Sequence, residues 1–310
     1  MENTLHTLPE KLSPSRLKDY MQCPKLFYYK SILKLPTKGT IHTLRGEVVH
    51  LVLEQIFTHP TEERGVDQAV LYAKGALNLT VNPVVAREEV LDPYETKLRE
   101  TLGLWDLSDK EAERALKKSY DSVEILELNG GAEQLLLEVI ELINSYYKME
   151  NPLKFDPKDR ELHVEAEIKG YKIQGYIDRL DVFEKKGVEE VYISDYKTGS
   201  VPGERYLEEA FFAMKIYALL LKLSKGISTK ALRLLYVKTG ERSGIKSFEV
   251  DEKTLEATQK QVGSVISNIK KDFKTESWST KKGPLCNWCS FKDICPEFNS
   301  EMSDLSISPL

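Results

Sequence analysis

Four cysteines are placed so that a site containing all of them would join the two ends of the chain. Three form a local cluster, Cys286-x2-Cys289-x5-Cys295, and Cys23 stands near the opposite end. A site built from all four thiols would cross-link nearly the whole chain and strongly restrict its unfolded state. This spacing therefore constrains the fold more than any other feature, because it requires the two ends of the chain to lie together.

The arrangement of the thiols bears on what they bind. Zinc and an iron–sulfur cluster both accept four thiolates. Structural zinc sites usually present two Cys-x2-Cys units, whereas the spacing here is one plus three, and Cys23 and Cys295 each precede a proline. We expect a [4Fe–4S] cluster held by Cys23, Cys286, Cys289 and Cys295, with zinc as the alternative. Unrelated buried thiols or disulfides fit less well, because three cysteines crowd together and a reducing compartment is expected.

The composition is that of an ordinary globular protein, with 41% hydrophobic and 30% charged residues. No apolar run approaches the ~18 residues of a membrane span. The first residues do not resemble a secretory signal, so we expect a cytoplasmic protein with no membrane partner. The net charge of −5 argues against non-specific coating of nucleic acid, but a local basic channel remains compatible with it.

The hydrophobic periodicity changes along the chain. It is helical up to about residue 150, and strict alternation begins near residue 160, for example at Leu162, Val164, Ala166 and Ile168. Helices are predicted at 13–22, 24–33, 40–57, within 62–150, and at 204–223 and 251–273. Strands are predicted at 161–168, 171–183, 189–197, 230–237 and 246–250.

These elements predict an α/β fold in which a sheet is flanked by helices. The first three strands should form an antiparallel meander, since Gly170 and Lys185-Lys186-Gly187 mark the turns. We expect one domain over residues 1–310. Within it, 62–150 would be a helical insertion, 160–250 the sheet core, and 274–298 the cysteine segment that pairs with Cys23.

Two neighbouring strands carry an acidic motif. The first contains Gly175-Tyr-Ile-Asp178, and the second contains Asp195-Tyr-Lys197-Thr-Gly199. Residues two apart on a strand share a face, so Asp195 and Lys197 should project together, within reach of Asp178. Carboxylates bind Mg²⁺ or Mn²⁺, and the ion can activate water and polarise a phosphoryl oxygen. The set fits phosphodiester hydrolysis, whereas a surface ion pair is the structural alternative.

The expected lysine would orient or help to deprotonate the attacking water and balance the charge of the phosphate. Partial burial beside cations predicts a lowered pKa for Lys197. His50, in Arg45-Gly46-x-x-x-His50, lies in an otherwise apolar predicted helix. On chemistry alone it is more typical of a packed core residue than of a ligand, because imidazole suits Mn²⁺ but not Mg²⁺.

Residues 11–38 are rich in lysine and arginine, and aromatic rings lie among these cations. Bases can stack on such rings while cations contact phosphates. The simpler interpretation is an amphipathic helix pair with a solvated basic face. The rings concerned are Tyr20, Phe27, Tyr28 and Tyr29.

Taken together, the motifs resemble the RecB-type branch of the PD-(D/E)XK nucleases, in particular stand-alone exonuclease-like proteins with an iron–sulfur clasp. They are similar also to the nuclease of CRISPR spacer acquisition and to the nuclease half of bacterial AddB. The resemblance extends from Leu12 to Cys295 and is specific only in combination. The matching segments are Leu12-Ser-Pro-Ser-Arg16, Tyr20-x-x-Cys23-Pro24, Arg45-Gly46-x-x-x-His50, Gly175-x-x-Asp178-Arg179, Asp195-Tyr-Lys197-Thr-Gly199, Lys215-x-Tyr217-Ala-Leu219 and the three C-terminal cysteines.

The resemblance implies a restriction-endonuclease-like core and a metal-dependent DNA nuclease, typically an exonuclease acting on single strands or ends in repair and recombination. It implies that His50, Asp178, Asp195 and the backbone carbonyl of Tyr196 bind Mn²⁺ or Mg²⁺, and that Lys197 is catalytic. It assigns the four cysteines to a [4Fe–4S] cluster. Weaker substrate contacts would come from Arg16, Tyr20 and Tyr217, although Tyr217 fits a half-buried aromatic residue equally well.

One position departs from the family pattern. The family places Gln-x-x-x-Tyr on the helix after the lysine strand, and here Ala213 replaces the glutamine. Because alanine cannot hydrogen-bond through its side chain, the alternative is a weakly active or non-catalytic module that binds DNA ends beside a helicase. No phosphate-binding Gly-x-x-x-x-Gly-Lys-[Ser/Thr] loop occurs in the sequence, so a helicase motor would come from a partner.

Overall fold

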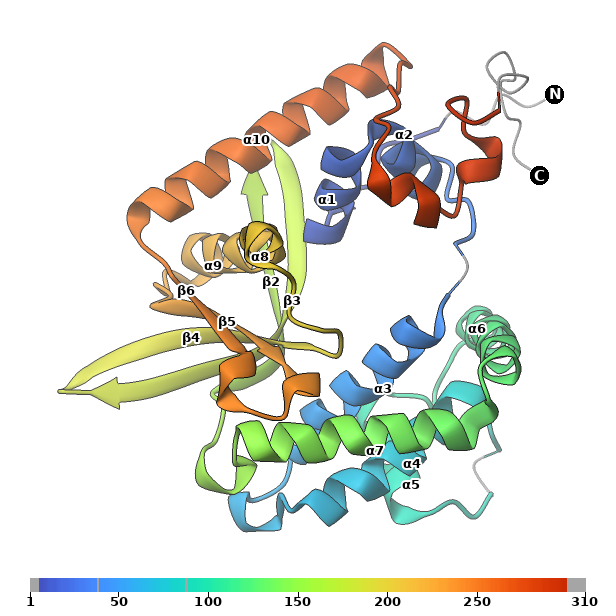
Figure 1. The fold of residues 1–310 in the computed structure, drawn as a ribbon, viewed down its shortest axis with the longest axis vertical. Helices are drawn as coiled ribbons and strands as arrows, with labels where there is room; N and C mark the ends of the chain where they lie inside the picture. The colour runs from blue at the N-terminus through green and yellow to red at the C-terminus, as the bar shows by residue number, and fades with distance from the viewer. Residues whose placement is uncertain (1–5, 38, 87–88, 300–310) are drawn as a thin grey trace.

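The computed structural model describes residues 6–37, 39–86 and 89–299. In this part of the chain a six-stranded mixed sheet has the order β1-β3-β4-β5-β6, with β2 paired to β3 (Figure 1). The expected meander of β2, β3 and β4 is confirmed, and β4 pairs in parallel with β5. The strands are β1 (Lys11–Leu12), β2 (Asp159–Ile168), β3 (Tyr171–Lys185), β4 (Val188–Lys197), β5 (Ala231–Tyr236) and β6 (Ile245–Glu249).

Two-residue turns set the register of the meander. Lys169-Gly170 connects β2 to β3, and Lys186-Gly187 connects β3 to β4. All four residues have positive φ, between 53° and 75°. Such turns match the right-handed twist of the paired strands, and glycine adopts this backbone without steric cost.

Helices cover both faces of the sheet. Local caps start several of them, since the side chains of Ser13, Thr40 and Asp251 accept backbone N–H groups of the first turn. The helices are α1 (Pro14–Gln22), α2 (Pro24–Phe27), α3 (Ile41–Ile56), α4 (Val66–Val81), α5 (Pro93–Thr101), α6 (Asp109–Leu128), α7 (Gly131–Met149), α8 (Glu204–Ala210), α9 (Phe212–Lys225) and α10 (Glu252–Lys274).

Two predicted helices are interrupted. The helix expected at 204–223 is divided into α8 and α9 at Phe211, and the helix expected at 24–33 changes after Phe27 into a π-helical turn, Tyr28–Ile32. A π turn is a local irregularity that hydrophobic spacing does not reveal. Among the described residues, no helix combines the length and apolarity needed to cross a bilayer.

Two apolar cores lie on opposite sides of the sheet. One is formed by α1, α9 and α10 with β3, β4 and β5. The other is formed by α3, α4 and α7, which pack on Tyr196 and Leu235. Residues 62–150 are helical as expected, and Figure 1 shows α4 to α7 gathered with α3 below the sheet.

The N-terminal helices pack against the C-terminal segment, as the cysteine spacing predicts (Figure 1). The Lys25 amide donates to the Ser279 carbonyl at 3.0 Å, and the Tyr29 hydroxyl donates to the Ile294 carbonyl at 3.0 Å. The Tyr28 ring stacks on Trp278 at 5.4 Å between ring centroids. The two ends of the chain are thereby joined by contacts that do not involve the thiols.

Burial changes the interpretation of the aromatic residues in the basic stretch. Tyr20 is 7% exposed and its hydroxyl donates to Asp272 at 2.6 Å. Phe27 and Tyr29 are also buried. The proposed stacking of bases on these three rings is therefore wrong for this conformation, and the simpler interpretation as an amphipathic helix pair accounts for them.

A buried ionic network lies between the sheet and α7. Arg179 on β3 is 1% exposed, and its guanidinium donates to Glu150 at 2.8 Å and to the hydroxyls of Tyr146 and Tyr196, both at 3.0 Å. Asp181, also 1% exposed, accepts from Arg179 at 3.0 Å. Removing one partner from such a network leaves an uncompensated buried charge.

We expect Arg179→Met to destabilise the fold by about 3–5 kcal/mol, because Asp181 and Glu150 would lose their main counter-ion. The measurement is the free energy of unfolding in urea. Arg114→Met, at an exposed position on α6, is the matched control and should change it by less than ~0.5 kcal/mol. Equal effects of the two substitutions would contradict this account of the network.

Gly175 lets α9 approach the sheet closely. A Cβ atom at this position would lie 2.4 Å from the Tyr217 ring. At Gly199, beyond β4, a Cβ would meet no atom within 4 Å. The glycine before Asp178 is thus required by the packing of Tyr217, which the sequence motif alone did not explain.

Gly175→Ala should therefore destabilise the protein by about 1–3 kcal/mol, because the ring must move out of its position. Thermal unfolding of Gly175→Ala and of the control Gly199→Ala measures the difference. A double variant, Gly175→Ala with Tyr217→Ala, should recover part of the loss. If the double variant lost as much stability as the two single variants together, the steric explanation would fail.

Candidate active site

The predicted metal ligands lie together at the junction of α3, β3 and β4. His50 on α3 contacts Asp178 through Nδ1, 3.1 Å from Oδ2, and its Nε2 lies 2.8 Å from the backbone carbonyl oxygen of Tyr196. The Tyr196 amide in turn donates to Asp178 Oδ2 at 3.1 Å. Gly46, one turn earlier on α3, faces Thr198 just beyond β4, where a Cβ would lie 3.5 Å from the hydroxyl oxygen, an ordinary van der Waals contact.

Asp195 and Lys197 project together from β4, as the strand period predicts. Lys197 Nζ lies 2.5 Å from Asp195 Oδ2, in an ion pair whose carboxylate is buried. This oxygen nevertheless has no partner of regular hydrogen-bond geometry in the described structure. A buried carboxylate oxygen that lacks a well-aligned donor can accept a cation.

The carboxylates repel one another and attract positive charge. Burial and the neighbouring Asp178 raise the pKa of Asp195 to about 6. Burial works against the charged imidazole of His50, but Asp178 and Asp195 outweigh it and raise its pKa to about 9. In this arrangement the charged imidazole of His50 and the ammonium of Lys197 balance Asp178 and Asp195, and a bound divalent cation would take the place of the imidazole proton.

The expectation for the pKa of Lys197 is wrong. Burial lowers it, but the adjacent Asp195 more than offsets burial, so the pKa of Lys197 is raised above its usual value. The prediction assumed cationic neighbours, whereas the structure surrounds the ammonium with carboxylates. Lys197 is therefore positively charged at neutral pH and suited to hold a phosphate or a water rather than to remove a proton.

Glu161 on β2 is a site residue that the sequence analysis missed. Arg160 pairs with Arg179 and Leu162 with Ile177, which puts Glu161 opposite Asp178. Burial, with Asp178 and Glu54 nearby, raises the pKa of Glu161 to about 7. In the sequence, Glu161 is recognisable only as a polar residue in an alternating strand. Glu165 and Glu167 occupy equivalent positions of β2, so the pattern does not single out Glu161.

The strands are irregular at this point. Glu161 has a φ of +44°, which is rare for a residue with a side chain. On β3, Ile177 and Leu180 both enter the same core although they are three residues apart. Regular alternation would send them to opposite faces. Such distortions re-aim side chains and are common beside active sites.

The weaker substrate positions have different surroundings. Tyr217 on α9 is half-buried, and burial together with Asp195 and Asp178 raises its pKa, so the ring adjoins the carboxylates. Ala213 lies one turn earlier on the same helix. Arg16 is exposed and donates to the Lys11 carbonyl at 2.8 Å. Tyr20 is buried away from solvent.

The donor set is compatible with a hard divalent cation. Carboxylate and carbonyl oxygens with one imidazole suit Mn²⁺ and, less well, Mg²⁺. Among the described residues, no three His, Cys, Asp or Glu side chains are already gathered around one ion position. The donors are paired with each other instead, since His50 contacts Asp178 and Lys197 contacts Asp195.

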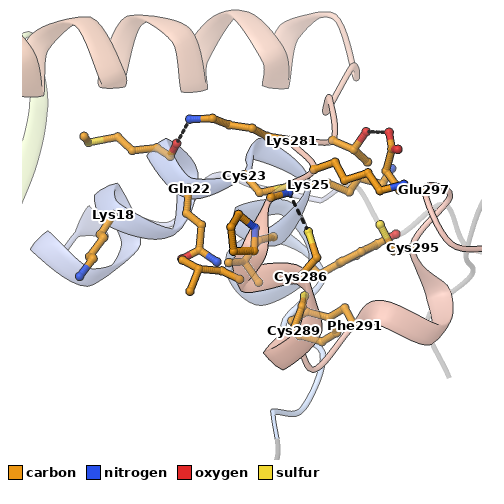
Figure 2. A pocket seen from close by; sticks show the side chains of 18 of the residues that line it. Lys18, Gln22, Cys23, Lys25, Lys281, Cys286, Cys289, Phe291, Cys295 and Glu297 are labelled. Carbon is orange, nitrogen blue, oxygen red and sulfur yellow. Dashed lines mark hydrogen bonds between the residues drawn. The ribbon is translucent and has the colours of Figure 1, made fainter. Parts of the chain in front are cut away.

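The four cysteines line one cavity of about 650 Å³ between the two ends of the chain. Figure 2 shows Cys286, Cys289 and Cys295 on the C-terminal segment, beside Cys23 and Lys25 of the N-terminal helices. Burial raises the pKa of the Cys295 thiol, and the other three cysteines act on it in the same direction. The cavity lining thus includes the donor chemistry of a four-thiolate group, while within the described residues no three of these thiols are gathered around one ion position.

Comparison with known proteins finds similarity to nucleases over most of the chain. A profile of the PD-(D/E)XK nuclease superfamily matches residues 11–296. The B subunit of an ATP-dependent helicase/deoxyribonuclease from Clostridium botulinum (strain Loch Maree / Type A3) is 24% identical over 285 residues, 86% of this chain and 22% of that protein. The corresponding protein of Carboxydothermus hydrogenoformans is 27% identical over 200 residues, 63% of this chain and 17% of that protein.

A crystal structure from Eubacterium rectale, described as that of a candidate exonuclease, is similar with a TM-score of 0.43 and 12% identity, and covers 97% of this chain and 91% of that one. The chain spans about a fifth of the length of the curated relatives it matches. The family profile covers nearly all of the chain, including both acidic strands, His50 and the four cysteines. The chain belongs to the PD-(D/E)XK nuclease superfamily.

Proposed function

We propose that the chain is a metal-dependent DNA nuclease that hydrolyses phosphodiester bonds. The observation that carries this proposal is the convergence of His50, Asp178, Asp195 and Lys197, from three elements, on one half-buried position. Family membership supports the same reaction class. The residues differ in role. His50, Asp178 and Asp195 would hold a metal ion, whereas Lys197 itself carries the positive charge.

Asp178, Asp195, His50 and the Tyr196 carbonyl would hold Mn²⁺ or Mg²⁺. The bound ion supplies Lewis-acid chemistry, polarising a phosphoryl oxygen and lowering the pKa of water. Asp178 accepts the Tyr196 amide, which fixes the neighbouring carbonyl in place. Lys197, charged beside Asp195, would hold the negative charge that develops on the phosphate or orient the attacking water.

We infer that the substrate is DNA, taken at an end or as a single strand, in repair or recombination. The relatives are named as subunits of a helicase/deoxyribonuclease, which supports a DNA substrate and a helicase partner. An exonuclease mode follows from the family resemblance. The alternative of an end-binding module with little activity has one observation in its favour, which is alanine at position 213.

We further propose that Cys23, Cys286, Cys289 and Cys295 hold a [4Fe–4S] cluster. Its support is the shared cavity, which joins a thiol from the end of α1 to three from the C-terminal segment. Such a group would act as a structural clasp, because metal binding by residues far apart in sequence stabilises the folded chain.

Lys197→Ala should lower the rate of degradation of end-labelled single-stranded DNA by about 10²–10³-fold in Mn²⁺, because a charge aimed at the transition state is lost. Lys253→Ala, an exposed position on α10, is the control and should retain full activity. Omission of the divalent cation should abolish activity in all three proteins.

Two results would overturn the assignment. Unchanged cleavage by Lys197→Ala would place the reaction elsewhere. Binding of DNA ends without cleavage by the wild type would favour the end-binding alternative, and Ala213→Gln would then test whether the family glutamine restores hydrolysis.

Anaerobically purified protein should be brown, with the broad visible absorbance of an iron–sulfur cluster and iron in elemental analysis. Cys23→Ser should lose most of this absorbance and unfold at lower temperature, because one of four ligands and the terminal link are removed. A colourless protein that contains zinc would show that the four cysteines bind zinc instead of an iron–sulfur cluster. Unchanged iron content in Cys23→Ser would exclude Cys23 from the site.

A further inference from the structure

An exposed pair of rings lies on β2 and β3 beside the candidate active site. Tyr176 is 53% exposed, and the ring of His163 lies 5.1 Å from it, centroid to centroid, with the planes tilted by 50°. The two residues are direct cross-strand partners. Both side chains are on the surface, so this tilted pair of rings is accessible from solvent.

The pair continues the row of site residues. Tyr176 precedes Asp178 by two positions on β3, and His163 on β2 is the cross-strand partner of Tyr176. Side chains two apart on a strand share a face and are separated by about 7 Å. The ring pair is therefore the next step along the sheet from the carboxylates, within reach of a nucleotide adjacent to one bound there.

Fold stability does not explain the exposure of Tyr176. Among the described residues the buried tyrosines Tyr20, Tyr29 and Tyr146 use their hydroxyls in hydrogen bonds, whereas the Tyr176 hydroxyl forms none. A single exposed ring needs no explanation by itself, so it is the place of Tyr176 beside the acidic site that points to a ligand.

Positive charge lies farther along the same face. Lys11 and Lys172 both contact Glu165, at 2.5 Å and 4.0 Å, and Glu165 follows His163 by two positions. Arg16 adjoins Lys11 through its carbonyl. Glu167, opposite Lys172, leaves a net charge of about +1 over this group. Along this face the site carboxylates are followed first by the two rings and then by the group with a net charge of about +1. A single strand of DNA could place a base on the rings and a phosphate near this group.

We propose that Tyr176, with His163 behind it, is a base-stacking platform for single-stranded DNA. It would hold the base next to the phosphate that lies at Asp178 and Asp195. Stacking on one ring needs an unpaired base with a free face and tolerates any base, so the platform would favour single strands over duplex without sequence preference. This inference rests on the proposed function, because it places the substrate of that site.

The test is binding of a fluorescein-labelled oligothymidylate, followed by anisotropy, in the Lys197→Ala background with Mn²⁺ so that the strand stays intact. Tyr176→Ala should weaken binding about tenfold, because base–aromatic stacking is lost. Tyr176→Phe keeps the ring and should bind within about twofold of the parent. Tyr120→Ala, which removes a 73% exposed ring on α6, should have no effect.

Blunt duplex of the same length provides a second comparison, and Tyr176→Ala should change its affinity by less than about twofold. The proposal is overturned if Tyr176→Ala binds the single strand like its parent, if Tyr176→Phe loses as much affinity as Tyr176→Ala, or if the parent binds no single strand. Thermal unfolding checks that each variant is folded.

Binding and cleavage separate this inference from the proposed function. Tyr176-dependent binding by a wild-type protein that cannot cut DNA would sustain the platform and refute the nuclease. Normal cleavage with no dependence of binding on Tyr176 would refute the platform alone.

Discussion

Arg179 follows Asp178 directly on β3 and places its guanidinium in the core between the sheet and α7. Its contacts with Tyr146 and Glu150 come from the helical side, and its contact with the Tyr196 hydroxyl comes from β4. Tyr196 is therefore held at its ring by Arg179, while its backbone carbonyl faces His50. One buried cation thus fixes the helical segment, the strand that carries Asp195 and the neighbour of Asp178 in a single arrangement.

That arrangement makes the site possible despite its electrostatic cost. Asp178, Asp195 and Glu161 are near one another, and burial together with mutual repulsion raises the pKa values of Asp195 and Glu161. If these three carboxylates were free to move, they would separate and become hydrated. The network behind them, in which Arg233 also pairs with Glu150, limits this relaxation. The buried network thus lies directly behind the strands that bring these carboxylates together.

The sequence predicted those features whose causes are local. Alternation and turn residues gave the meander, helical periodicity gave most helices, and the strand period put Asp195 beside Lys197. His50 was different, because its position against Tyr196 depends on how α3 packs on the sheet, and only resemblance to a family made it a candidate. Glu161 was missed because its place opposite Asp178 depends on register and an unusual φ, which composition does not encode.

The error at Tyr20 has a similar origin. A tyrosine among cations is equally compatible with a surface ring and with a core ring whose hydroxyl reaches a distant acid. Here the partner is Asp272 on α10, 252 residues away, so no local pattern could separate the two. The raised pKa of Lys197 likewise reflects a neighbour's charge, since Asp195, two positions earlier on the same strand, outweighs the burial of the ammonium.

The N-terminal strand β1 and the acidic site meet on β3. β1 pairs in parallel with β3 at Lys172 and Ile173, and α1 leads from β1 directly to Cys23. Farther along β3 come Tyr176 and then Asp178. Cys23 is therefore connected through α1 and β1 to the strand that carries the carboxylates. The cysteine spacing and the acidic motifs, which are far apart in the sequence, thus lie on elements that meet at β3.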